Sequence, residues 1–120
     1  MNQGEAVAFA KQWADDWNRH DVEAVLSHFA DDVIFTSPLA GQLFPESGGV
    51  IRGKDALRRY WNEGIRRNPA LRFEVLGAYA GVDTVVIRFR TERGADRCEV
   101  LTFGAGLVRT GHGTYPAADG

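Results

Sequence analysis

The chain has 120 residues, a size typical of one domain, and is 44% hydrophobic and 25% charged. Its formal net charge is −2 at pH 7 and acidic residues separate its arginines, so nothing in the charge balance favours nucleic acid or an anionic membrane as partner. No apolar run approaches the ~20 residues needed to cross a bilayer. We therefore expect a single soluble domain over residues 1–120.

Cysteine and histidine usage limits the chemistry further. The single cysteine, Cys98, excludes an intramolecular disulfide and a cysteine-ligated zinc cluster. Residues 1–5 lack a basic segment followed by an apolar stretch, which together with the lone thiol predicts a cytoplasmic protein. No His, Asp and Glu cluster offers three or four convergent ligands, so we expect neither a metal nor another cofactor.

The first third of the chain predicts two helices and a strand. Apolar residues between positions 5 and 18 recur at steps of three and four: Ala6, Phe9, Ala10, Trp13 and Trp17. Asp21 is a suitable N-cap for a second helix that extends to Phe29. Residues 33–37 then predict a short strand, which Pro38 ends because proline cannot donate to a strand ladder.

Three glycines and a proline between positions 39 and 50 predict an ordered loop or lid. A third helix follows at 54–67 and ends at Asn68-Pro69. Its apolar residues fit a helix that lies across a sheet: Leu57, Tyr60, Trp61 and Ile65.

Four strands are predicted in the second half, at 71–79, 84–91, 97–103 and 107–115. Short glycine-containing turns at 81–83, 92–94 and 104–106 separate all four and indicate antiparallel hairpins. Helices followed by a run of antiparallel strands are typical of the α+β class. Three helices on one face of a curved sheet would leave a cavity between the two layers.

Three segments in this order resemble SnoaL-like proteins of the nuclear transport factor 2-like superfamily. They are W-N-R-H-D-V-E-A-V-L-S-H-F-A-D-D-V-I-F-T-S-P at 17–38, I-R-G-K-D-A-L-R-R-Y-W at 51–61 and C-E-V-L-T-F-G-A-G-L-V-R at 98–109. The resemblance implies an α+β cone, with three N-terminal helices packed on a curved, mostly antiparallel sheet. It also implies a pocket for a small apolar molecule and a homodimer formed through the sheet.

That superfamily includes ketosteroid isomerases, limonene epoxide hydrolase, polyketide cyclases and binding proteins without a known reaction, so the chemistry has to be argued from residues. Glu99 is the first candidate. It alternates in register with Leu101 and Phe103, so it faces the cavity if they do. The resemblance places there an acid that donates a hydrogen bond to a substrate oxygen. The opposite register, with Cys98, Val100 and Thr102 buried, fits the alternation equally well.

Ser37 marks a departure from the isomerases. It occupies the position where the resemblance places their catalytic base, and a serine hydroxyl without a base partner cannot abstract a proton at neutral pH. Trp13 and Trp17 occupy the helix that carries a tyrosine in those enzymes, and an indole donates a hydrogen bond but cannot relay a proton. Both differences count against isomerase activity.

His112 is a candidate partner for Glu99 across the last hairpin, where the two would form an acid–base dyad. Its neighbours Gly111 and Gly113 support a different interpretation, an exposed histidine on a loose strand. The candidate ligand-binding residues are one serine and eight aromatic or apolar residues from the predicted helices and strands: Trp13, Trp17, Phe35, Ser37, Tyr60, Trp61, Phe73, Leu101 and Phe103.

Two hypotheses follow. The first is a cofactor-free isomerase, cyclase or hydrolase that uses Glu99 and His112 on a small apolar ligand. The second, motivated by the missing base at Ser37, is a non-catalytic ligand-binding or dimerisation module.

Overall fold

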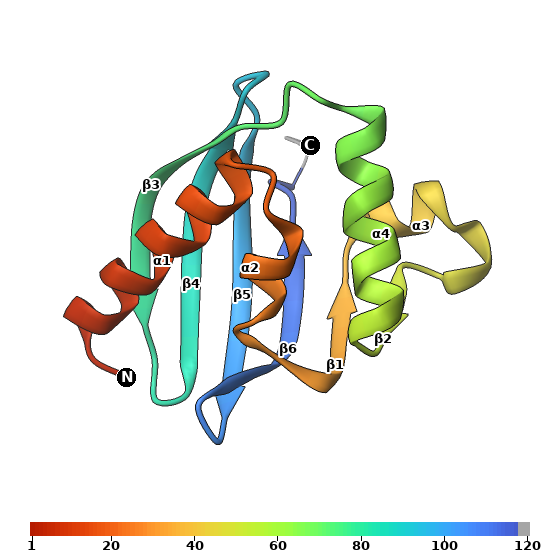
Figure 1. Ribbon diagram of the computed structural model, residues 1–120. Coiled ribbons are helices and arrows are strands. Elements are labelled where there is room, and N and C mark those ends of the chain that lie inside the picture. Colours follow the sequence, from red (N-terminus) through yellow and green to blue (C-terminus); the bar gives the residue numbers. More distant parts are fainter. Residues whose placement is uncertain (118–120) are drawn as a thin grey trace.

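The computed structural model describes residues 1–117, which form a curved six-stranded sheet with helices α1, α2 and α4 on one side (Figure 1). The elements in chain order are α1 (Gln3–Asn18), α2 (Val22–Leu26), β1 (Phe29–Thr36), α3 (Pro38–Leu43), the 3-10 turn η1 (Pro45–Ser47), β2 (Val50–Arg52), α4 (Lys54–Arg67), β3 (Phe73–Ala80), β4 (Thr84–Thr91), β5 (Asp96–Gly104) and β6 (Leu107–Thr114). The strand order is β2-β1-β6-β5-β4-β3, and every neighbouring pair is antiparallel except β1 and β6. The predicted α+β cone is confirmed.

Local capping explains where the first two helices begin. Asn2 and Glu5 form a reciprocal capping box, in which each side chain accepts a hydrogen bond from the other residue's backbone N–H. Asp21 caps α2, as predicted, by accepting from the N–H of Ala24 at 3.0 Å. Both helices therefore begin at a side chain that satisfies free amides of the first turn.

The predicted end of the second helix is wrong. Helix α2 ends at Leu26, and Phe29 is already the first residue of β1. Phe29 pairs in parallel with Val108, and the N–H of Val108 donates to the carbonyl of His28 at 2.9 Å. This pairing with a segment far along the chain outweighs the local helical spacing, and a single sequence cannot reveal such a pairing.

The segment predicted as a loop contains more structure than expected. Pro38 ends β1 and also starts α3, where its missing N–H is not needed. Ser37 is the N-cap, and its hydroxyl accepts from the N–H of Leu39 at 3.2 Å. After η1, strand β2 pairs with β1 and forms the sheet edge.

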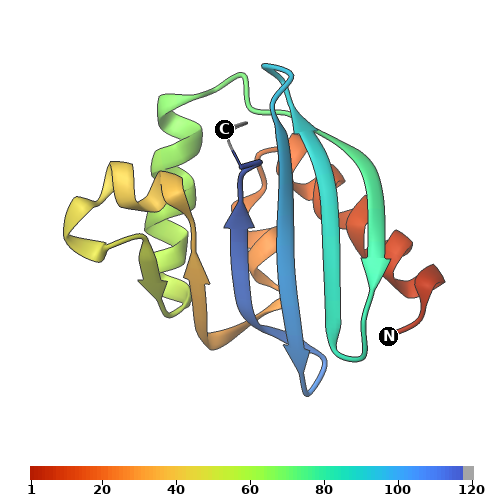
Figure 2. The same cartoon turned by 180° about the vertical axis from the view of Figure 1, so that it is seen from behind.

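The sheet has two different faces. The inner face, toward the helices, carries the buried residues Val85, Ile87 and Phe89 of β4 and Leu101 of β5. The outer face has no helix over it among the described residues (Figure 2). Within residues 1–117, no helix is long and apolar enough to cross a membrane.

Candidate functional site

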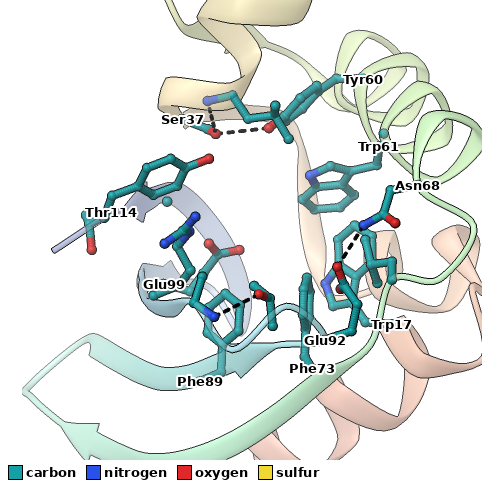
Figure 3. Close-up of a pocket in the computed structure, with 18 of the residues that line it drawn as sticks. Trp17, Ser37, Tyr60, Trp61, Asn68, Phe73, Phe89, Glu92, Glu99 and Thr114 are labelled. Atoms are coloured by element: carbon teal, nitrogen blue, oxygen red, sulfur yellow. Dashed lines mark hydrogen bonds between the residues drawn. The ribbon is translucent and has the colours of Figure 1, made fainter.

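A cavity of about 560 Å³ lies between the inner face of the sheet and helices α1, α3 and α4 (Figure 3). Aromatic rings make much of its wall: Trp13, Trp17, Phe35, Tyr60, Trp61, Phe73, Phe89 and Tyr115. The rings pack against one another, as in the stacked pair Trp13 and Phe73 with centroids 5.4 Å apart. An aromatic cavity of this size suits a small ring-containing molecule.

Most of the predicted ligand-binding residues line this cavity, together with Glu99: Trp13, Trp17, Phe35, Ser37, Tyr60, Trp61 and Phe73. Leu101 and Phe103 do not line it. Leu101 is fully buried in the core, and the Phe103 ring packs edge-on against Phe9 at 5.3 Å. Both share the inner face with Glu99, but they lie farther along β5 and outside the cavity lining. Alternation predicted the correct face of the strand but not how far along it the cavity extends.

Glu99 presents an acid to the cavity. The residue is 7% exposed, and its side chain forms no hydrogen bond or ion pair with residues 1–117. Burial raises its pKa to about 8, because the protein interior disfavours the charged carboxylate. Glu99 is therefore mostly protonated at neutral pH and can donate a hydrogen bond to a ligand oxygen.

Ser37 and Tyr60 form a second polar group in the same wall. Their hydroxyl oxygens are 2.9 Å apart, and both residues are buried. Burial raises the pKa of the Tyr60 phenol, with the nearby Glu99 as a smaller cause, so Tyr60 stays neutral. One hydrogen bond joins two hydroxyls, so whichever one donates, the other O–H remains available to a ligand.

Gly113 lies between these two groups. The parallel pairing of Thr36 with His112 brings Ser37 alongside Gly113, and the next ladder pairs Gly113 with Glu99. A β-carbon at Gly113 would lie 3.5 Å from Glu99 Oε1 and 3.6 Å from Ser37 Oγ. The absent side chain leaves a notch that the carboxyl and the hydroxyl flank. We call it the Gly113 notch.

The predicted pairing of His112 with Glu99 is not formed. His112 lies opposite Val100 in the ladder, whereas Glu99 lies opposite Gly113. Consecutive strand residues point to opposite faces, so His112 is on the outer face. There its Nδ1 lies 2.6 Å from Thr36 Oγ1. The alternative of an exposed histidine on a loose strand does not hold either, because His112 is half-buried and β6 lies inside the sheet.

The mouth of the cavity carries polar residues that the sequence interpretation missed. Arg97 shares the inner-face register of Glu99, and its guanidinium carbon lies 3.8 Å from the centre of the Tyr115 ring. Glu92 accepts hydrogen bonds from Asn68 Nδ2 and from the N–H of Arg72, both at 3.1 Å. The alternation that singled out Glu99 also applied to Arg97, two residues earlier. Within residues 1–117 no three His, Cys, Asp or Glu side chains are grouped to hold a metal ion.

Comparison with protein families identifies a SnoaL-like domain over residues 10–120. The chain belongs to the SnoaL-like family. The predicted membership of the nuclear transport factor 2-like superfamily is thereby confirmed, and the matched range contains the cavity residues described above. No curated protein matches the chain.

Solved structures agree with this assignment. A SnoaL-like protein of unknown function from Burkholderia thailandensis is 38% identical, with a TM-score of 0.91, 97% of this chain covered and 98% of the other. AclR, a putative hydroxylase from Streptomyces galilaeus, is 18% identical with a TM-score of 0.73 and coverages of 96% and 91%. A putative polyketide cyclase from Sinorhizobium meliloti is 14% identical with a TM-score of 0.75 and coverages of 95% and 100%. The last two share the fold.

Proposed function

We propose that this SnoaL-like protein binds a small, largely apolar ring compound in its aromatic cavity and holds a carbonyl oxygen of that compound in the Gly113 notch. The observation that carries the proposal is Glu99, a buried carboxyl without a protein partner among residues 1–117. Glu99 lines the cavity, so a ligand acceptor there can take a hydrogen bond from the protonated carboxyl.

The notch has two O–H donors for one oxygen. Protonated Glu99 donates from one side, and the Ser37 hydroxyl donates from the other when it accepts its own hydrogen bond from Tyr60. Two donors aimed at a carbonyl oxygen stabilise the negative charge that develops there during enolisation or addition. This supports cofactor-free acid catalysis, of the kind used in isomerisation, cyclisation or hydrolysis.

A second candidate function, ligand binding without turnover, is favoured because residues 1–117 place no free base beside Glu99. The other carboxylate that lines the cavity, Glu92, is occupied by Asn68 and Arg72. Ser37 cannot abstract a proton unaided. Turnover of a bound ketone would exclude this second candidate.

The test uses methyl 4-acetylbenzoate, a neutral aromatic ketone, with binding followed by NMR titration. Glu99→Leu removes the donor and should weaken binding about tenfold, the value of one hydrogen bond. Glu99→Gln keeps an N–H donor and should bind nearly as wild type does. Above pH 8 wild-type Glu99 loses its proton, so binding should weaken in wild type and not in Glu99→Gln. Equal binding by all three proteins at every pH would refute the proposal.

We also propose that the protein is a cytoplasmic homodimer formed through the outer face of the sheet. The free thiol of Cys98 supports the cytoplasmic location, because the cytoplasm is reducing and keeps thiols free. The uncovered face supports the dimer, because it carries half-buried apolar residues of β1, β4 and β5: Ile34, Val86 and Val100. A twofold pairing of two such faces would cover them in both copies.

A further inference from the structure

Arg97 lies at the mouth of the cavity, in line with Glu99. It pairs with Phe89 in the β4–β5 ladder, and Glu99 pairs with Ile87, so both side chains belong to the inner face. Two residues along a strand span about 7 Å. The two side chains therefore leave the same face of β5 at backbone positions about 7 Å apart.

The guanidinium of Arg97 is held in place but leaves most of its hydrogen-bonding capacity free. Its position over the Tyr115 ring is a cation–π contact. One N–H donates to the carbonyl of Asp96 at 2.7 Å. A guanidinium has five N–H donors in a planar fork that matches a carboxylate. The remaining donors have no acceptor among residues 1–117.

Arg97 differs in this respect from the other two arginines that line the cavity. Arg67 forms an ion pair with Glu63 at 2.8 Å, and Arg93 lies 3.6 Å from Glu92. Arg97 forms no ion pair within the described part of the chain. Among the described arginines that line the cavity, Arg97 is therefore the one whose charge is free to bind an anion.

We propose that Arg97 binds an anionic group of the ligand, so that the ligand is a compact ring compound with a carboxylate at one end and a carbonyl oxygen at the other. This inference rests on the proposed function, which places the carbonyl in the Gly113 notch. The carboxylate lies over the guanidinium beside Tyr115, and the ring spans the aromatic wall between them.

The test compares 4-acetylbenzoate with its neutral methyl ester at pH 7 and low salt, by NMR titration. Wild type should prefer the acid on the order of tenfold or more, because hydrogen bonds between ionised groups are about twice as strong as neutral ones. Arg97→Gln should abolish the preference while the ester binds as before. Arg97→Lys keeps the positive charge but lacks the planar set of guanidinium donors, so it should retain part of the preference for the acid. The matched control, Arg88→Gln, changes an outer-face arginine and should leave the preference intact.

Each outcome separates the two proposals. Equal affinity of wild type for acid and ester would overturn the role of Arg97 and leave the proposed function standing. The same holds if Arg97→Gln retains the preference while its thermal unfolding matches wild type. If neither compound perturbs cavity resonances, the cavity does not take aryl ketones, and both proposals are wrong.

Discussion

Glu99 Oε1 and Ser37 Oγ flank Gly113, each within 3.6 Å of the position that a β-carbon would take there. The arrangement depends on three adjacent strands, since Ser37 follows β1, Gly113 is in β6 and Glu99 is in β5. A carboxyl and a hydroxyl from distant parts of the chain thus face one small space. A glycine between them keeps that space open.

Gly113→Ala should fill the notch without damaging the fold. Its β-carbon would meet its neighbours at 3.5–3.6 Å, which is ordinary van der Waals contact. Stability should stay the same or rise by about 0.4–1 kcal/mol, since alanine restricts the unfolded chain. Binding of methyl 4-acetylbenzoate should be lost, as NMR titration would show. Undiminished binding would mean that the ligand oxygen lies elsewhere.

Gly111→Ala is the contrasting variant on the same strand. A β-carbon there would lie 2.7 Å from Phe35 Cδ2 and 3.1 Å from Leu101 Cδ2, both in the core. Overpacking of this kind costs about 1–3 kcal/mol. Urea unfolding should therefore show a loss of stability in Gly111→Ala that Gly113→Ala does not share.

The hydrogen bond between Ser37 and Tyr60 can be measured by a double-mutant cycle. Tyr60→Phe and Ser37→Ala each remove one partner, and the coupling between them should be about 1 kcal/mol. Ser37→Ala should cost more than Tyr60→Phe, because the Ser37 hydroxyl also accepts from the N–H of Leu39. Urea unfolding of the three variants supplies the values. Strictly additive losses would show that the pair contributes no direct stabilisation.

Local signals in the sequence were sufficient for most of the fold. Helix α4 has the predicted bounds, because its apolar spacing and the Asn68-Pro69 stop agree. Strand β4 also matches, since its alternation and flanking turns are both strong. The errors fall where long-range pairing decides. Phe29 belongs to β1 because β6 lies beside it, and no property of residues 22–29 indicates that contact.

The site was predictable only in part, for the same reason. Alternation and resemblance placed Glu99 on the inner face, and burial gives it a raised pKa. The Gly113 notch depends on the parallel register of β1 and β6, which local patterns do not encode. The dyad with His112 failed because the β5–β6 register sets Gly113, rather than His112, opposite Glu99. Arg97 had the same alternation as Glu99, but exposed arginines are common and its relation to Tyr115 becomes visible only in three dimensions.

The proposed dimer predicts a selective effect of substitutions on the outer face. Val100 is half-buried on that face, opposite His112 in the ladder. Val100→Arg places a charge at the centre of the proposed interface and should shift sedimentation from dimer to monomer. Val82→Arg, at an exposed turn beyond the sheet, is the control and should sediment as wild type does. A wild-type protein that sediments as a monomer at all concentrations would refute the interface.

The stability of the protein should depend on pH through Glu99. Its pKa is about 8 in the folded state against an ordinary value of 4.5, so between these values the folded chain holds a proton that the unfolded chain has lost. The free energy of unfolding therefore falls as pH rises from about 5 to 8, and this loss is complete above the folded-state pKa. Glu99→Gln carries no such proton. Relative to wild type it should gain stability from pH 5 to pH 9, on the order of a few kcal/mol. Urea unfolding of both proteins across this range measures the difference, and parallel curves would show that Glu99 ionises as it would in water.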